Sequence, residues 1–247
     1  MDIEIRECVR HEEFEQCVEL QRLVWQFSDL DLVPTHIFVV SRHTGGFTLG
    51  AFTASNEMVG FAYALVAGGG EKICYHSDML AVSPAYQGQG IGRRLKLGQR
   101  EFALKHGIDL IVWTFDPLQA LNAHFNINKL GVVARTYEVN CYGSASSSHL
   151  HQGLDTDRLL AEWWLDSPAV RSRLNGAEVP TPPPAATVKI PADISSLKAR
   201  DLDAARVWQL QVRRQFLEHF ASGLYVAGFE PLADGSTFQY LLYPGEP

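Results

Sequence analysis

The segment 75–95 constrains the fold of this chain more than any other, because it combines a strand, a proline turn, a glycine-rich loop and a helix. Glycines at positions 88, 90 and 92 leave backbone amides uncovered by side chains and permit positive φ angles. The helix is indicated by apolar or small residues at spacings of three and four, namely Ile91, Leu95, Gly98 and Phe102. A loop of this kind at a helix N-terminus suits an anion, since its unpaired amides and the helix dipole point at the same place.

Three cations lie in the first turns of that helix: Arg93, Arg94 and Lys96. A cation at a helix N-terminus opposes the helix dipole and costs about 0.3–1 kcal/mol, a cost that a bound polyanion would reverse. A plain β–α connection would account for the glycines but not for these charges. The pattern therefore predicts a site for a phosphate-bearing ligand.

The spacing of the glycines excludes two common nucleotide-binding loops, because neither G-x-G-x-x-G nor G-x-x-x-x-G-K-[ST] occurs. The spacing instead matches Q/R-x-x-G-x-G, with Gln87, Gly90 and Gly92, after the strand Leu80-Ala81-Val82-Ser83-Pro84. This strand, loop and helix resemble the GNAT superfamily of acyl-CoA-dependent N-acyltransferases. The resemblance covers about residues 1–168, and its specific part lies within 72–132.

The resemblance implies that an acyl-CoA, by default acetyl-CoA, is the co-substrate and that no metal is needed. In the family the loop amides hold the coenzyme A pyrophosphate, and the strand before the loop pairs with the pantetheine arm. Carried onto this sequence, the pantetheine contacts are Leu80, Ala81 and Val82, and the pyrophosphate contacts are Gln87, Gly88, Gln89, Gly90, Ile91, Gly92 and Arg93. Asn122 joins the cofactor set, because it lies on the helix that flanks the cofactor in the family.

The strand predicted at 72–82 carries the candidate catalytic side chains. Period-two alternation divides it into two faces, one with His76, Asp78, Leu80 and Val82 and the other with Tyr75, Ser77, Met79 and Ala81. Titratable groups beside a cofactor loop are candidates for acid–base work. Many GNAT enzymes have an acidic residue two positions before the Leu of Leu-x-Val, which takes a proton from the acceptor amine. The resemblance thus implies that Asp78 is the base.

Asp78 and His76 both stay candidates for this role. An unperturbed Asp has a pKa of about 3.9 and needs burial to act at neutral pH, whereas His already has a pKa of about 6.5. An Asp–His pair that only stabilises the strand end is the structural alternative. The oxyanion of the tetrahedral intermediate also needs a donor, and the resemblance implies a backbone N–H at or near Leu80.

The helix predicted at 118–129 departs from the family at the general acid. The family pattern N-x-x-A-x-x-L-Y-x-K-L-G-F is matched at Ala123 and at Lys129-Leu130-Gly131. Ile127 stands where the usual Tyr protonates the departing thiolate. Two alternatives stay open. The thiolate leaves unassisted, since an alkyl thiol has a pKa of about 8–9, or the proton comes from Asn122, His124 or Asn126.

The whole pattern predicts a mixed α/β fold, with a central, mostly antiparallel sheet flanked by helices, as in the GNAT family. Strands are expected at 3–6, 47–53, 58–66, 72–82, 109–115, 132–142 and 158–165, and helices at 12–27, near 34–40, after 91 and at 118–129. In the family the first two helices border the acceptor pocket, which makes candidate contacts of Trp25, Phe27, His36 and Phe38. Ordinary core packing is the alternative for each of these four.

Three segments are expected: an acyltransferase domain at 1–168, a Pro-rich linker at 169–185, and an α+β extension at 186–247 that packs on the core. The β-α-β-β extension has a strand at 186–191, a helix at 201–220 and a hairpin turned by Ala233-Asp234-Gly235. Its order echoes part of a GNAT fold but lacks a glycine loop, so no second coenzyme site is expected. Its two candidate roles are closure over the acceptor site and a homodimer contact.

Composition narrows the class of partner and the compartment. A net charge of −7 argues against general nucleic-acid binding, which needs a basic face. The four cysteines form no C-x-x-C pair, and His149 and His151 lack a third metal ligand in register. The sequence shows no signal peptide and no apolar run of membrane-spanning length, so a cytoplasmic protein without membrane contact is expected.

These observations favour an N-acyltransferase that moves an acetyl or other short acyl group, succinyl included, from acyl-CoA to a primary amine. The motif contains no cysteine, so direct transfer is expected. A small amine or amino acid is favoured over a protein tail, because the predicted pocket is aromatic and lacks an acidic run. One alternative is a non-catalytic acyl-CoA-binding or sensory protein, which the missing Tyr at Ile127 favours. A nucleotide-binding protein of another fold should show a Walker lysine or an acidic metal ligand, and neither is present.

Overall fold

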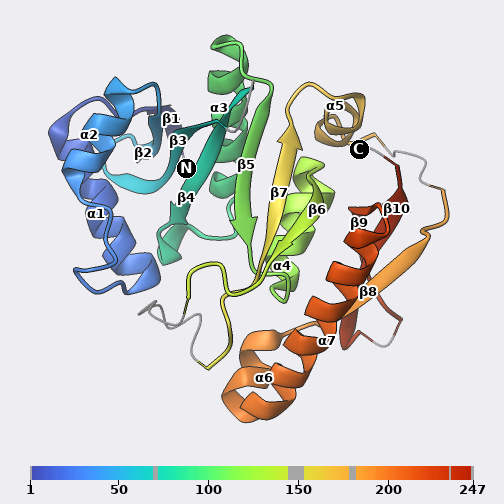
Figure 1. Ribbon diagram of the computed structural model, residues 1–247. Helices are drawn as coiled ribbons and strands as arrows, with labels where there is room; N and C mark the ends of the chain where they lie inside the picture. The colour runs from blue at the N-terminus through green and yellow to red at the C-terminus, as the bar shows by residue number, and fades with distance from the viewer. Residues whose placement is uncertain (1, 69–71, 144–152, 178–181, 234, 246–247) are drawn as a thin grey trace. The chain divides into compact units, whose positions relative to one another are not determined.

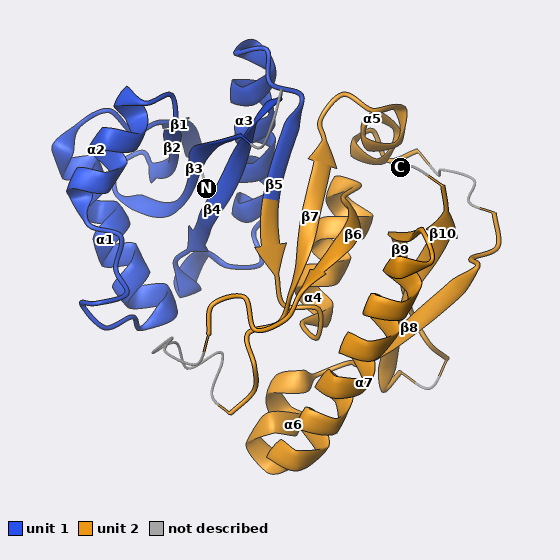
Figure 2. Ribbon diagram, in the orientation of Figure 1, with its two compact units in different colours: residues 1–112, 147–149 blue, residues 113–146, 150–247 orange. Residues whose placement is uncertain are grey.

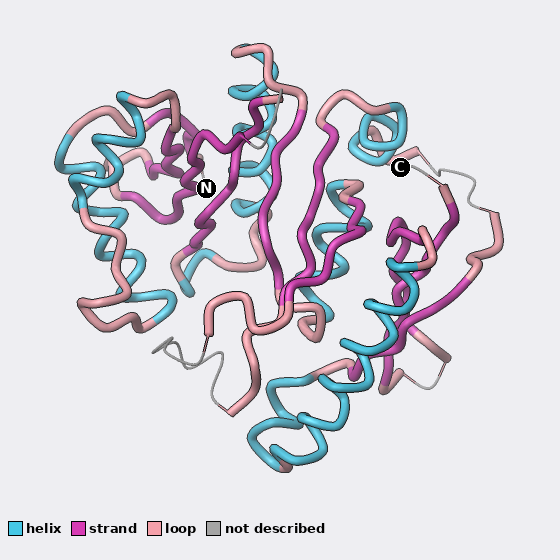
Figure 3. The backbone as a smooth tube through the Cα atoms, in the orientation of Figure 1, coloured by secondary structure: helices cyan, strands magenta, loops and turns pink. Residues whose placement is uncertain are grey.

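The computed structural model describes residues 2–68, 72–143, 153–177, 182–233 and 235–245 (Figure 1). The chain divides into two compact units (Figure 2). The first comprises residues 1–112, and the second comprises the described residues from 113 onward. Each unit has its own sheet strands and its own helices (Figure 3), and each is described by itself.

The first unit is built on strands in the order β1-β2-β3-β4-β5. Neighbours among the first four strands are antiparallel, and β4 pairs with β5 in parallel at Tyr75–Ile111 and His76–Val112. The strands are β1 (Ile3–Glu7), β2 (Phe47–Thr53), β3 (Met58–Gly68), β4 (Ile73–Val82) and β5 (Leu110–Phe115), of which 110–112 belong to this unit. The helices are α1 (His11–Trp25), α2 (Thr35–His43), the 3₁₀ turn Pro84–Tyr86 and α3 (Ile91–Lys105).

Helices cover both faces of this sheet. On one face α1 and α2 bury an aromatic cluster in which Phe38 contacts Phe14, Phe61 and Tyr63 at centroid distances of 5.8, 6.2 and 4.8 Å. On the opposite face α3 packs through Phe102, which stacks on Phe47 of β2 at 3.9 Å. The alternation of side chains along the strands supplies apolar groups to both layers, as the sequence predicts.

The start of α1 is fixed by one buried carboxylate. Glu13 is 1% exposed and accepts hydrogen bonds from the backbone amides of Val9 (2.8 Å) and Arg10 (3.0 Å). The guanidinium groups of Arg6 (2.6 Å) and Arg10 (2.8 Å) donate to its other oxygen. An acidic group in the first helical turn also favours the helix dipole. Glu13 therefore joins the end of β1 to the beginning of α1.

The second unit continues from residues 113–115 of β5 in the order β5-β7-β6-β9-β10-β8. Its strands are β6 (Val133–Glu138), β7 (Arg158–Trp164), β8 (Ala186–Pro191), β9 (Leu224–Pro231) and β10 (Thr237–Pro244). Its helices are α4 (Ala120–Ala123) with a π-helical continuation η2 (His124–Leu130), α5 (Pro168–Leu174), α6 (Ile194–Arg200) and α7 (Leu202–Ala221).

The C-terminal strands extend the sheet of this unit. β9 pairs antiparallel with β6, with Ala134 opposite Val226. The side-chain amide of Asn128 in η2 donates to the carbonyl of Phe229 at 2.7 Å, and the buried hydroxyl of Tyr240 donates to the carbonyl of Pro117 at 2.6 Å. Residues from 186 onward therefore share one core with β6, β7 and η2.

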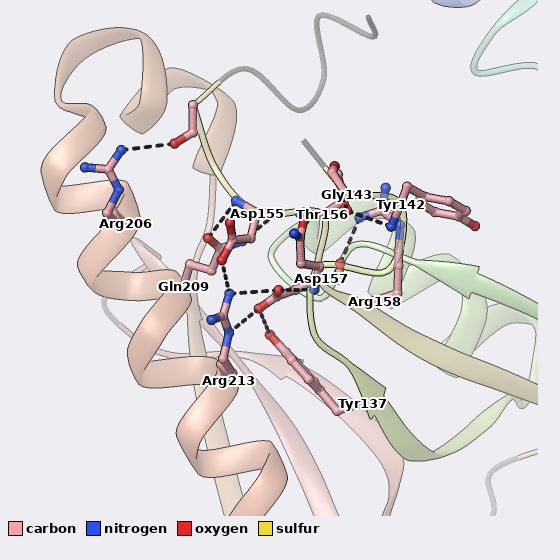
Figure 4. Close-up of polar contacts among 12 residues, drawn as sticks. Tyr137, Tyr142, Gly143, Asp155, Thr156, Asp157, Arg158, Arg206, Gln209 and Arg213 are labelled. Carbon is pink, nitrogen blue, oxygen red and sulfur yellow. Dashed lines mark hydrogen bonds and ion pairs between the residues drawn. The ribbon is translucent and has the colours of Figure 1, made fainter. Parts of the chain in front are cut away.

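An arginine of α7 fastens that helix to the segment before β7 (Figure 4). Arg213 donates to both oxygens of Asp157, at 2.8 and 2.9 Å, and to Asp155 at 2.6 Å. Tyr137 of β6 donates to the same Asp157 carboxylate at 2.6 Å. The side-chain amide of Gln209 accepts a hydrogen bond from the backbone N–H of Asp155 and donates one to its carbonyl. Since Asp157 is only 1% exposed, the carboxylate of this ion pair is shielded from solvent.

Most of the expected elements are present, and three differ. α5 lies within the segment expected to be a linker, and it begins at Pro168 with Ser167 as its cap. α6 was not expected, and its cap is Asp193. The helix expected at 118–129 is largely π-helical. The triple-glycine connector at 68–70, the loop holding His149 and His151, and the turn at Asp234 lie wholly or partly outside the described residues.

The C-terminal segment is not a repeat of the first unit. β8 pairs with β10, the second strand after its helices, whereas β1 pairs with β2, the first strand after its helices. The shared order of strand, helices and hairpin therefore gives two different strand arrangements.

Candidate functional site

The glycine-rich loop connects β4 to α3 as predicted. The 3₁₀ turn ends at Tyr86, residues 87–90 are exposed, and α3 begins at Ile91. Gly88 and Gly90 have φ angles of 74° and 77°, in the left-handed region that side chains disfavour. A Cβ at either glycine would meet nothing within 4 Å, so backbone conformation rather than crowding requires glycine here. The space above the loop is open to a ligand.

The backbone amides of this loop are available as donors. Within the described residues, the N–H groups of residues 88–92 have no acceptor, and the N–H of Arg94 donates to the carbonyl of Gly90. The first amides of a helix have no partner inside it. Five neighbouring donors at the positive end of a 15-residue helix form a cradle for an anion such as a pyrophosphate.

Two glutamine side chains brace the loop. The amide nitrogen of Gln87 donates to the carbonyl of Val82 at 3.1 Å, at the last residue of β4. The amide nitrogen of Gln89 donates to the carbonyl of Ala85 at 3.3 Å. The motif glutamine therefore ties the loop to the strand that precedes it, which the sequence pattern did not indicate.

The cations of α3 do not all face the loop. Arg94 donates to the carbonyl of Ile3 in β1, and Lys96 is 4% exposed with its ammonium nitrogen 2.8 Å from the hydroxyl of Ser77. The expectation that the first-turn charges together mark a phosphate site is therefore wrong for Lys96, whose stem turns inward beside Leu95. Arg93 stays in the predicted contact set and is half-buried.

A β-bulge interrupts β4 at Asp78. Tyr63 of β3 is opposite Met79, and Ala64 is opposite Ser77, so Asp78 is an extra residue without an opposite partner on β3. A bulge adds one residue to one strand and re-aims the side chains around it. The expected alternation of faces is therefore wrong beyond this point.

The bulge exchanges the faces of the residues that follow it. Leu80 and Val82 turn toward α3, where a Cβ at Gly92 would meet them at 3.6 and 3.9 Å. Met79 and Ala81 instead pack with the α1 and α2 cluster. His76 and Asp78 therefore no longer share a face with Leu80 and Val82.

The surroundings of Asp78 change the pKa of its carboxyl. Its side chain is exposed, yet the protein around it raises its pKa by desolvation, an effect that a positive charge on His76 would oppose. Across the bulge, burial raises the pKa of Tyr63, and the negative charge of Asp78 adds to that rise. The buried Tyr63 hydroxyl lies beside Ser41, whose side chain partly opposes that rise.

The four aromatic or imidazole candidates on the acceptor side differ in exposure. Trp25 and Phe27 are half-buried and stack at 5.4 Å, and His36 is exposed. Phe38 is 1% exposed and belongs to the core cluster. Trp25, Phe27 and His36 thus reach the surface of the first unit, while Phe38 lies in its core.

Comparison with known proteins identifies the domain. The model of the acetyltransferase (GNAT) family matches residues 9–126. The chain carries a GNAT acetyltransferase domain. The protein is accordingly an acyltransferase. No protein of curated function matches the sequence significantly.

Solved structures share the GNAT fold of this chain. The ribosomal-protein-S18-alanine N-acetyltransferase from Escherichia coli is 16% identical, with a TM-score of 0.51 over 67% of this chain and 96% of its own. An acetyltransferase of the GNAT family from Streptococcus pneumoniae is 18% identical, with a TM-score of 0.50 over 65% of this chain and 98% of its own. A chain of the NatC complex bound to Gag peptide and CoA is 15% identical, with a TM-score of 0.51 over 66% of this chain and 98% of its own.

The remaining predicted positions of the GNAT pattern lie in the second unit. Asn122 is exposed on α4, whereas Ile127 in η2 is fully buried and packs in the core. Burial, with the charge of Lys129, lowers the pKa of His124, whose ring is 3.0 Å from the amide of Asn128. The side chain that replaces the usual Tyr is thus a packing residue.

The described residues hold neither a clustered metal site nor a membrane-spanning helix. No three His, Cys, Asp or Glu side chains gather there as a metal site. In the same part of the chain, no helix is long and apolar enough to span a bilayer.

Proposed function

We propose that this protein transfers an acetyl or other short acyl group from acyl-CoA to the primary amine of a small molecule or amino acid. The observation that carries the proposal is the loop between β4 and α3. It presents five backbone amides without an acceptor among the described residues, beside two left-handed glycines and open space. Such a cradle suits the pyrophosphate of coenzyme A, and the family match supports an acyl-CoA donor.

The proposed cofactor contacts are those predicted from the sequence. The loop residues 87–93 would hold the pyrophosphate, and 80–82 of β4 would pair with the pantetheine arm. Asn122 stays a proposed contact from the second unit. Leu80 and Val82 turn their side chains toward α3, which leaves the backbone of this strand end as the group that meets the pantetheine amides.

In the proposed reaction Asp78, directly or through water, takes a proton from the acceptor ammonium, and His76 is the second candidate for this step. The neutral amine then attacks the thioester carbonyl, forming the C–N bond. A backbone N–H at or near Leu80 would stabilise the oxyanion. The C–S bond then breaks to release the thiolate of coenzyme A, and the nitrogen loses its second proton to that thiolate or to water. Most of the rate gain would come from positioning in one complex.

For the whole chain we propose a catalytic domain at 1–168, a linker at 169–185 and an extension at 186–247. Solved GNAT structures that cover 65–67% of the chain support the first boundary. We further propose that the protein acts in the cytoplasm, with no nucleic-acid or membrane partner, and that a homodimer is its candidate assembly.

Thermal unfolding of the purified protein with acetyl-CoA, succinyl-CoA or free coenzyme A tests the cofactor site. A ligand at about 100 times its Kd stabilises by about 2.7 kcal/mol, which raises Tm by several degrees. Gly90→Glu should abolish the shift, because a charged side chain would enter the open space above the amides.

Gly107→Glu is the matched control, since Gly107 has a φ of 74°, close to the 77° of Gly90, and equal open space at the far end of α3. Both variants should lose similar basal stability through backbone strain, and the Gly107 variant alone should keep the ligand shift. No shift in the unsubstituted protein with any thioester would refute the proposed donor.

An amine screen with the thioester giving the larger shift then tests catalysis, by following release of the coenzyme A thiol. Thiol release that depends on a small amine, with the acylated amine identified by mass, is the expected result. A thermal shift without transfer to any amine or amino acid would instead support a binding or sensory role.

A further inference from the structure

A buried polar network lies between α3 and β4. Lys96 is 4% exposed, Ser77 is 5% exposed and Gln99 is fully buried. The ammonium nitrogen of Lys96 donates to the Ser77 hydroxyl at 2.8 Å, and that hydroxyl donates to the side-chain oxygen of Gln99 at 3.0 Å. The amide nitrogen of Gln99 has no hydrogen-bond partner in the described part of the chain. Three polar side chains therefore occupy a position where a helix normally buries apolar groups.

Burying this polar network costs more free energy than an apolar core would. Burial lowers the pKa of Lys96 to about 7, which reports the cost of keeping an ammonium away from water. Even buried ion pairs can often be replaced by well-packed apolar side chains of similar volume with no loss of stability. A methionine at this position would fill the same space without that cost. Stability alone therefore does not account for a lysine here.

The network meets β4 immediately before the bulge. Ser77 is opposite Ala64, and the next paired residue is Met79, so Ser77 is the last regular position before Asp78. Its side chain points to α3, on the side of the sheet opposite the α1 and α2 cluster in which Met79 packs. A bond to Ser77 therefore fixes the strand at the point where its register breaks. In a strand, a slip of one residue turns each side chain to the other face.

We propose that Lys96 is a positioning residue, which through Ser77 holds the β4 bulge in register and so aims Asp78 at the acceptor. The inference rests on the proposed function, because Lys96 contacts no substrate in it and acts only through Asp78. Gln99 completes the arrangement, because its side-chain oxygen accepts a hydrogen bond from the Ser77 hydroxyl and leaves the oxygen lone pairs of Ser77 for Lys96.

Lys96→Met, Ser77→Ala and the double variant test this inference, with Lys105→Met as the control. Lys105 is an exposed lysine in the last turn of the same helix. Each protein is compared for Tm, for the thermal shift with acetyl-CoA, and for kcat and KM in the amine assay. Lys96→Met should unfold at the same or a higher temperature and keep its acetyl-CoA shift and KM. Its kcat should fall by about 10- to 100-fold, since small misplacements of reacting groups have effects of that size.

Ser77→Ala should lower kcat in the same way, and the double variant should be no slower than Lys96→Met, because the two side chains act as a unit. Lys105→Met should match the unsubstituted protein. An unchanged kcat in Lys96→Met would overturn the inference, as would a fall in kcat that follows a fall in Tm. Losses that add in the double variant would also overturn it.

If Lys96→Met does not fold, Ser77→Ala decides: a lower kcat at unchanged Tm supports the inference, and an unchanged kcat overturns it. If the unsubstituted protein transfers no acyl group, the proposed function fails, and the role assigned to Lys96 fails with it. That result differs from an active protein whose Lys96 variant is equally active.

Discussion

Replacing Glu13 with Gln should cost the protein about 3 kcal/mol of stability at neutral pH. Burial by itself would raise the pKa of this carboxyl, but hydrogen bonds from the backbone amides of Arg10 and Val9 and from the Arg6 and Arg10 guanidinium groups outweigh burial. Together they hold the pKa at about 2, below its ordinary value of 4.5. Each pKa unit corresponds to about 1.4 kcal/mol, so the folded state gains about 3 kcal/mol from this carboxylate.

The sign of the pH dependence follows from the direction of the shift. A pKa that is lower in the folded state stabilises the protein above the unfolded pKa of 4.5, and this stabilisation is lost as the pH falls toward 2. Gln keeps the size of the side chain but carries no charge. Since a domain is stable by about 5–15 kcal/mol in total, the loss is large enough to measure.

Urea unfolding at several values between about pH 7 and pH 3.5 measures the effect. The free energy of unfolding of Glu13→Gln should lie about 3 kcal/mol below that of the unsubstituted protein at pH 7, and the difference should narrow below about pH 4.5. Glu15→Gln, at a side chain that is 60% exposed on the same helix, is the control and should change stability little. A difference for Glu13→Gln that is below about 1 kcal/mol, or that stays constant with pH, would refute the reasoning.

Two further changes probe the catalytic strand and the attachment of α7. Asp78→Asn should lower kcat by about 10²–10⁴-fold and keep the acetyl-CoA thermal shift, and an unchanged kcat would remove Asp78 from the mechanism. Desolvation raises the pKa of Asp78 above 3.8, so a pH–rate profile should show activity rising through that higher pKa. Arg213→Leu leaves the Asp157 carboxylate buried without its guanidinium and should cost about 3–5 kcal/mol in urea unfolding. Adding Asp157→Asn should restore much of the lost free energy of unfolding. A double variant as unstable as Arg213→Leu alone would contradict this account.

The glycine-rich loop could be predicted from sequence because its signals are local. Glycine at 88 and 90 is required by φ angles of 74° and 77°, and the helix that follows shows its period within four turns. Positive φ and helical spacing both depend on neighbouring residues alone. The same holds for β4 up to Ser77, where the alternation of faces is regular.

The bulge at Asp78 and the inward Lys96 could not be predicted in this way. An extra residue in a strand is decided by pairing with β3, and period-two alternation within β4 contains no sign of it. Lys96 reads as a surface cation, yet its partner Ser77 lies 19 positions earlier in the chain. The only sequence feature beside Lys96 that indicates burial is Leu95, on the apolar face of the predicted helix.

α5 and α6 were missed for a different reason. Each has seven residues, which is too short for a helical period to emerge from the apolar positions. Their caps, Ser167 before Pro168 and Asp193 before Ser196, were the usable signals. The acceptor pocket stays predicted only as a region.

The pairing of β9 with β6 decides which strand edges of this protein are open. A GNAT sheet that ended at β6 would present a row of unpaired backbone groups there, ready to pair with another chain. Here β9 occupies that edge, and β8 becomes the last strand of the second unit among the described residues. β8 carries an exposed Lys189 and ends at Pro191, two features that discourage further strand addition. A homodimer formed through β6 would first have to displace β9 from its own sheet.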